Sequence, residues 1–138
     1  MKKLSLFILT LLPALFTMAQ SGAKQHRIVI QMTSEDTLVH KSLMKQLNHI
    51  FILAPDAQVE VVCHGPGLSM LVAEKTIVQP KIHEMASKGV KFVACEFSMQ
   101  ERNVTRDKLL RDAGTVKGGI IEVVTKQEEG WSYIKSGF

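Results

Sequence analysis

Cysteines and metal-ligand patterns are sparse in this sequence. Its 138 residues include two cysteines, Cys63 and Cys95, which are too few for a disulfide scaffold. No Cys-x-x-Cys or His-x-x-x-His spacing occurs, whereas structural zinc sites take four nitrogen or sulfur ligands. We therefore expect no metal and no other cofactor. A metal site formed by Cys63, His64 and Cys95 is the weaker alternative.

No apolar stretch is long enough for a comfortable membrane-spanning helix, which needs about 20 residues. The apolar segment 4–16 follows two lysines and precedes small residues at positions 17 and 19, which is the pattern of a secretory signal peptide. No cysteine lies near this cleavage point to carry a lipid. We expect a cleaved signal peptide over residues 1–19, a single domain over residues 20–138, a periplasmic or secreted location and no stable membrane anchor.

Aromatic residues and excess charge are also scarce. Aromatics make up 6% of the chain, and its formal net charge is +4. Residues 1–19 hold two lysines and no acid, so the expected mature chain has a charge of +2 (15 basic against 13 acidic residues). The basic residues are scattered and are not interleaved with aromatics, unlike those of single-strand binders. We expect no nucleic-acid partner.

Apolar periodicity divides the mature chain into alternating strands and helices. The expected strands cover residues 26–32, 58–63, 90–94, 115–117 and 131–134. The expected helices cover residues 34–54, 68–72, 77–88, 96–102, 106–112 and 119–129. Residues 120–124 prefer a strand by propensity, but the polar residues that follow favour a helix. This order predicts an α/β domain with a mostly parallel five-stranded sheet and helices on both faces.

Two details of the helices can be predicted as well. Ser34, followed by two acidic residues, is the expected N-cap of the first long helix. His40 and His83 fall outside the apolar stripes of their helices. We therefore expect both histidines at the surface.

Cys95 lies at the junction between an expected strand, residues 90–94, and an expected helix. Unpaired N–H groups and the positive end of the dipole at a helix N-terminus favour a thiolate. The alternative is a buried structural cysteine, because free cysteines are often buried. Cys95 is thus the first candidate for a reactive residue.

A second strand end carries Cys63 and His64, followed by a turn with Gly65 and Gly67. The carboxyl ends of parallel strands form the edge where ligands bind, so these residues are expected along the same edge as Cys95. His64 is a candidate to accept a proton from Cys95 or, once charged, to lower its pKa. Cys63, Gly65 and Gly67 are candidate binding residues, although an ordinary strand-to-helix turn is the simpler explanation of the glycines.

Three short motifs follow one another in a recognisable order. They are His-Gly-Pro-Gly at residues 64–67, Gly-Val-Lys-Phe-Val-Ala-Cys at residues 89–95 with Met99, and Gln-Glu-Glu-Gly-Trp-Ser-Tyr-Ile-Lys at residues 127–135. In this order and spacing the sequence resembles the DsrE/DsrF-like family of sulfur-relay proteins, over about residues 26–135.

The resemblance implies a three-layer α/β/α, Rossmann-like fold and a homo-oligomer, a trimer or a hexamer. In the sulfur carriers of the family, a cysteine in the position of Cys95 holds sulfur as a persulfide and passes it to a partner's cysteine. The histidine of the turn corresponds to His64. Sulfur donor and acceptor proteins are the implied partners, and the chemistry needs no cofactor. The expectation is an exported persulfide carrier, and the alternative is a non-catalytic exported oligomer that binds a small ligand.

Two features depart from the well-known carriers. Those proteins are cytoplasmic, whereas this sequence has an expected export signal, and reduced persulfides are harder to maintain outside the cytoplasm. Cys63 is not part of the family pattern. A Cys63–Cys95 disulfide would either block Cys95 or resolve a persulfide during turnover.

Overall fold

The computed structural model describes residues 25–137, so the expected signal peptide over residues 1–19 lies outside the described part. At its centre is a sheet formed by β1 (Arg27–Met32), β2 (Gln58–Cys63), β3 (Lys91–Cys95), β4 (Ala113–Val116) and β5 (Ser132–Ser136). The α-helices are α1 (Thr37–Leu53), α2 (Gln79–Ser87), α3 (Glu96–Glu101) and α4 (Gly119–Glu128). The short 3-10 helices are η1 (Gly65–Leu71) and η2 (Arg106–Lys108).

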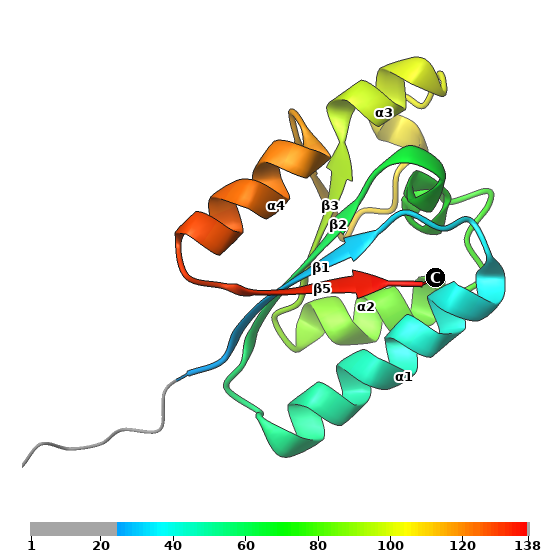
Figure 1. Ribbon diagram of the computed structural model, residues 1–138. Helices are drawn as coiled ribbons and strands as arrows, with labels where there is room; N and C mark the ends of the chain where they lie inside the picture. Colours follow the sequence, from blue (N-terminus) through cyan, green and yellow to red (C-terminus); the bar gives the residue numbers. More distant parts are fainter. Residues whose placement is uncertain (1–24, 138) are drawn as a thin grey trace, which may run out of the picture.

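All neighbouring strands run parallel, in the order β4-β3-β2-β1-β5. The helices α1 and α2 cover one face of the sheet, and α4 covers the other (Figure 1). Because crossovers between parallel strands are right-handed, the reversal of direction between β4 and β5 places α4 on the opposite face. The predicted α/β fold with helices on both faces is confirmed, and the described sheet is wholly parallel.

The larger part of the core lies between the sheet and the helices α1 and α2. Its members include Met32, Leu43, Leu47, Ile82 and Phe92, all of which are almost completely buried. Burying a side chain of this size contributes about 1.5–3 kcal/mol. This layer anchors β1, β2 and β3 so that their carboxyl ends are held in a fixed relation.

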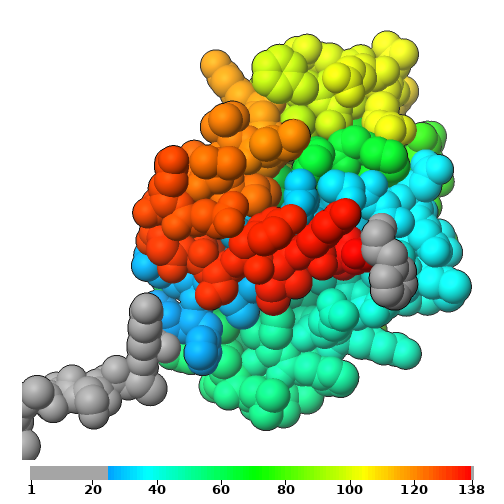
Figure 2. Space-filling model, viewed as in Figure 1, coloured from blue at the N-terminus to red at the C-terminus, as the bar shows by residue number. Residues whose placement is uncertain are grey.

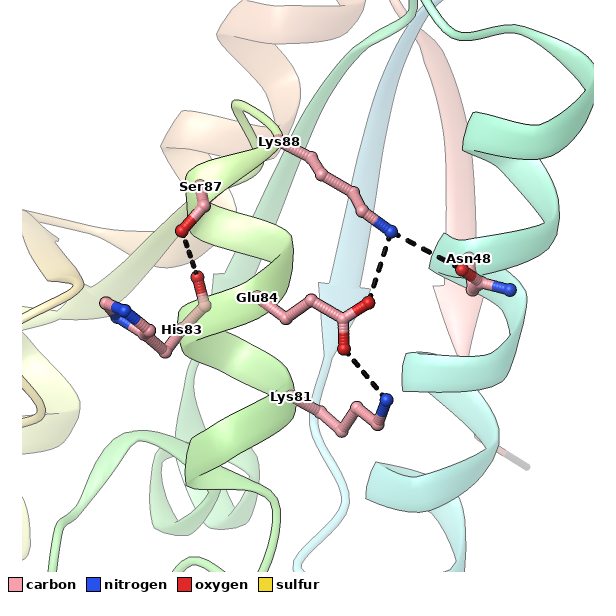
Figure 3. Close-up of polar contacts among 6 residues, drawn as sticks. All are labelled: Asn48, Lys81, His83, Glu84, Ser87 and Lys88. Carbon is pink, nitrogen blue, oxygen red and sulfur yellow. Dashed lines mark hydrogen bonds and ion pairs between the residues drawn. The ribbon is translucent and has the colours of Figure 1, made fainter.

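Polar side chains bridge α1 and α2 on the solvent side (Figure 3). Lys81 and Lys88 pair with Glu84 at 2.8 and 3.2 Å, and Lys88 also reaches the Asn48 side chain at 3.5 Å. Such exposed pairs contribute less than about 1 kcal/mol each. His83 is exposed, as predicted.

A buried charge pair fixes α4 to the other face. Glu60 of β2 is 3% exposed, and its carboxylate lies 3.5 Å from the Lys126 ammonium of α4. Burial raises the pKa of Glu60, while the charge of Lys126 opposes the rise. The Lys126 ammonium also lies 4.9 Å from the centre of the Trp131 ring. Together with the cluster of Val123 with Val29 and Val62, this pair holds α4 on the sheet.

Two local expectations for α1 are wrong. Its N-cap is Asp36, whose carboxylate accepts a hydrogen bond from the Leu38 N–H at 2.8 Å, whereas the Ser34 hydroxyl accepts one from the Asp36 N–H at 3.1 Å. His40 is 2% exposed, and its Nε2 bonds the Ser34 carbonyl oxygen at 2.8 Å, which gives the buried ring a polar partner.

The helix expected over residues 106–112 is also wrong, since only the single turn of η2 forms there. The Leu110 N–H donates to the Leu71 carbonyl, and the Ala73 N–H donates to the Lys108 carbonyl, both at 2.9 Å. These bonds to the end of η1 take the backbone groups that a helix would use. The tertiary pairing therefore overrides the local helix signal.

Candidate functional site

Cys95 ends β3 and is the N-cap residue of α3. It pairs with Val116 of β4 in the strand register, and 5% of its surface is exposed. Its Sγ lies 4.0 Å from the carbonyl oxygen of Lys117, in the connection that leads into α4. Cys95 therefore lies at the predicted junction, next to the beginnings of two helices.

Hydrogen-bond donors gather around the Cys95 sulfur. Burial acts to raise the pKa of this thiol, but the N–H and O–H of Ser98 and the N–H groups of Gly119 and Phe97 outweigh it, so the Cys95 pKa is lowered overall. The donors come from the first turns of α3 and α4. This arrangement favours a thiolate, as expected at a helix N-terminus.

Gly119 brings α4 against both strand ends. A Cβ at this position would lie 2.9 Å from the His64 Cβ and 3.2 Å from the Cys95 Cβ. Carbon atoms in proteins pack at about 3.5–4.0 Å, so the position leaves no space for a side chain. His64 and Cys95 thus flank one glycine, and the structure brings this predicted pair together.

The hydrogen-bond partner of the His64 ring is Gln31 of β1. The His64 Nε2 lies 2.7 Å from the Gln31 Nε2, and the Tyr133 hydroxyl of β5 donates to the Gln31 Oε1. Burial lowers the pKa of His64, which favours the neutral ring. The three side chains form a chain across β2, β1 and β5, which are adjacent in the sheet.

Both glycines of the turn after β2 have structural partners. Gly65 has a φ of +53°, which glycine adopts readily, and its N–H donates to the Ser98 Oγ at 2.8 Å. A Cβ at Gly67 would overlap the Met32 carbonyl group, and the Gly67 N–H donates to the His64 carbonyl at 3.1 Å. The turn therefore positions His64 and Ser98, and these two N–H groups are already engaged.

Cys63 lies on the other face of the sheet. It pairs with Ala94 in the strand register and is fully buried in the core beneath α1 and α2, where burial raises its pKa. Side chains alternate between the faces of a strand, so Cys63 and Cys95 project to opposite sides. Both are free thiols. The structure does not bring Cys63 to the site.

Five residues of the site were not predicted: Phe97 and Ser98, which follow Cys95 closely in the chain, and Gln31, Gly119 and Tyr133 elsewhere. Ser98 had a local signal, because it falls in the first turn of the expected helix, three residues after Cys95. The contributions of Gln31, Gly119 and Tyr133 depend on which strands are neighbours and on where α4 crosses the sheet. That information is absent from a linear pattern.

Two kinds of site are not found in the described residues. Within residues 25–137, no three His, Cys, Asp or Glu side chains are grouped so that they could hold a metal ion. In the same part of the chain, no helix combines the length and apolar character needed to cross a membrane.

Comparison of the sequence with protein-family models gives a match to the DsrE/DsrF-like family over residues 16–136. A comparison with curated proteins gives no significant match.

Solved structures share the fold. A protein of unknown function from Methanobacterium thermoautotrophicum, MTH1491, has a TM-score of 0.77 and 24% sequence identity, with 80% of this chain and 99% of that chain covered. The ychN protein from E. coli has a TM-score of 0.65 and 8% identity, over 80% and 98% of the two chains. BT1422 from Bacteroides thetaiotaomicron, a conserved protein of unknown function, has a TM-score of 0.63 and 17% identity, over 79% and 93%. At these identities the likeness concerns the fold alone.

Proposed function

Since the chain belongs to the DsrE/DsrF-like family, we propose that it is an exported sulfur carrier that holds sulfane sulfur as a persulfide on Cys95. The observation that carries the proposal is the Cys95 thiol itself, whose pKa is lowered by donors from the first turns of α3 and α4. The nucleophile in sulfur exchange is a thiolate. A site that lowers the pKa of its thiol therefore suits this chemistry.

The proposed cycle needs no external oxidant or reductant. The Cys95 thiolate attacks the outer sulfur of a donor protein's persulfide, so a new S–S bond forms while the donor's S–S bond breaks and the donor leaves as a thiolate. In the second step an acceptor thiolate attacks the outer sulfur on Cys95. The Cys95 sulfur then leaves as a thiolate, and the electron count of the protein is unchanged.

The position of Cys63 in the fold supports a sulfur-transfer cycle in which Cys63 does not react. Cys63 is fully buried on the opposite face, so a disulfide with Cys95 would need the strand ends to rearrange. We propose that Cys63 is a core residue and does not resolve the persulfide.

Two further parts of the proposal concern location and assembly. The segment 1–19 carries the sequence pattern of an export signal, which supports a periplasmic or secreted location. Phe97, Ile120 and Ile121 are 62%, 63% and 68% exposed, and the Phe97 ring and Ile121 both lie within 4 Å of a Cβ built at Gly118. Neighbouring exposed apolar groups are typical of interaction surfaces. They support the expected homo-oligomer, whose size light scattering of the purified protein would measure.

Intact mass spectrometry tests the proposal. Protein purified from the exported compartment would be treated with a protein persulfide or left untreated, without reductant. We expect a gain of one sulfur atom, about 32 Da, that maps to Cys95, is removed by reductant and is absent in Cys95→Ser. The Cys63→Ala variant should still gain it. A reduced, folded protein that never gains sulfur would refute the carrier and favour the alternative, an exported oligomer that binds a small ligand.

A further inference from the structure

Tyr133, Gln31 and His64 form a hydrogen-bond chain whose direction can be read from its atoms. The Gln31 amide nitrogen faces His64, at 2.7 Å from Nε2, while the Gln31 Oε1 accepts from the Tyr133 hydroxyl. An amide nitrogen has two hydrogens and no available lone pair. It can only donate, so the His64 Nε2 must be the acceptor.

An accepting Nε2 determines the state of the whole ring. A neutral imidazole carries its proton on one nitrogen and a lone pair on the other, so the proton of His64 is on Nδ1. A charged ring carries a hydrogen on both nitrogens. The hydrogen on Nε2 would then point at the hydrogens of the Gln31 amide, and the two groups would repel each other. The contact with Gln31 therefore excludes the charged ring for as long as the amide keeps its orientation.

We propose that Gln31 and Tyr133 are positioning residues that hold His64 as a neutral imidazole with its proton on Nδ1 and its Nε2 lone pair already occupied. Held in this way, His64 has no free lone pair with which to take a proton from Cys95. The Cys95 thiolate is then stabilised by the helix N-termini and Ser98. His64 lines the site as an uncharged side chain and takes no part in the proton transfer.

The fold fixes the middle of this hydrogen-bond chain and leaves its Tyr133 end partly exposed. Gln31 pairs with Lys135 of β5 and Val62 of β2 in the strand register, so the middle of the chain lies on a central strand. Tyr133 is 42% exposed on β5, the edge strand that lies along the surface between α4 and α1 (Figure 2). Because its side chain is partly exposed to solvent, Tyr133 is the member of the hydrogen-bond chain that can be substituted with the least effect on the fold.

The consequence for Cys95 rests on the proposed sulfur chemistry, whereas the tautomer of His64 does not. Nitrogen NMR of the labelled protein distinguishes the two neutral tautomers and the charged ring, because the couplings from the ring carbons' hydrogens differ for a protonated and an unprotonated nitrogen. Sulfur loading by mass is an independent measurement. A wrong assignment of the His64 tautomer and a wrong assignment of sulfur chemistry to Cys95 would thus be detected by different measurements.

The NMR spectrum at neutral pH should show the His64 proton on Nδ1 in the wild-type protein. In Gln31→Glu the carboxylate accepts hydrogen bonds only, so the proton should move to Nε2 and the ring should titrate at a pH about one unit higher. In Tyr133→Phe the amide loses its fixed orientation, and both tautomers should be present. Gln127→Glu, which adds the same charge on the exposed side of α4, is the matched control and should leave the His64 signals unchanged.

Two results would overturn the inference. One is a wild-type His64 ring that is charged or protonated on Nε2 at neutral pH, since the Gln31 amide would then have the opposite orientation. The other is a Gln31→Glu protein, folded by circular dichroism, in which the His64 tautomer and titration match those of the wild type.

Discussion

Gly65 and Ser98 join the two strand ends of the site through one hydroxyl. The Gly65 N–H donates to the Ser98 Oγ at 2.8 Å, and the Ser98 hydroxyl is among the groups that lower the Cys95 pKa. A hydroxyl accepts with its oxygen and donates with its hydrogen. The same group therefore holds the turn after β2 and stabilises the thiolate.

Replacing this hydroxyl should affect both properties. Ser98→Ala leaves the Gly65 N–H without its partner, which should lower the free energy of unfolding by about 1–3 kcal/mol. It should also raise the Cys95 pKa. Denaturant unfolding and the pH dependence of Cys95 alkylation measure the two effects. Ser69→Ala is the control, because the Ser69 hydroxyl is buried without a partner; its removal should cost no stability. An unaltered alkylation profile in Ser98→Ala would contradict the assignment.

Gly119 and Gly118 offer a matched pair of substitutions. Gly119→Ala introduces a Cβ 2.9 Å from the His64 Cβ, so α4 must shift; we expect a loss of about 1–3 kcal/mol and slower alkylation of Cys95. At Gly118 the nearest atom to an added Cβ is 3.7 Å away, in the Phe97 ring, so Gly118→Ala should be tolerated. Equal losses in the two variants would show that the crowding at Gly119 is relieved elsewhere.

The two cysteines should react very differently in the native protein. Cys95 has a lowered pKa, so its alkylation rate should reach half of its maximum below the pH of about 8.5 that is usual for a free thiol. Cys63 is fully buried, and burial raises its pKa, so it should react only after unfolding. Peptide mapping after a short pulse of iodoacetamide measures both. If Cys63 were labelled at the same rate as Cys95, its side chain would be accessible to solvent, which would contradict its burial in the core.

His64 links the stability of the fold to pH. Burial lowers its pKa in the folded state, so between that value and the unfolded pKa of about 6.5 the unfolded chain binds more protons. Stability should therefore be complete above pH 6.5 or so and fall as the pH is lowered through this window. Urea unfolding at pH 7 and pH 5 should show a larger loss in the wild type than in His64→Gln. The same loss in both would assign the pH dependence to other groups.

Much of the architecture could be predicted because its signals are local. The strand expected over residues 90–94 is short, apolar and bounded by Gly89, whose φ of +99° ends the preceding helix, and β3 forms there with Cys95 as its last residue. The helix from Gly119 was predicted over a competing strand signal, and the structure confirms it. The family resemblance is confirmed by the match over residues 16–136.

The rest of the site depends on contacts between distant segments. Gln31 and His64 are 33 positions apart, and Gln31 and Tyr133 are 102 positions apart, so their association follows from the position of β1 between β2 and β5. The burial of His40 likewise depends on a carbonyl six residues away rather than on the apolar stripe of α1. Periodicity tells which face of an element is apolar, but it does not tell which polar groups meet.

The cap position of α3 is occupied by a sulfur where an oxygen is usual. Cys95 has the backbone conformation of an N-cap, and the N–H groups of Phe97 and Ser98 act on its sulfur. Sulfur accepts hydrogen bonds only weakly, whereas serine at an N-cap typically adds about 0.5–2 kcal/mol over alanine. The chain thus keeps a sulfur where an oxygen would hold the helix better, which under the proposed function exchanges stability for reactivity. Cys95→Ser should consequently unfold at a denaturant concentration no lower than that of the wild type. Any activity that this variant lacks would then be a loss of chemistry from an intact fold.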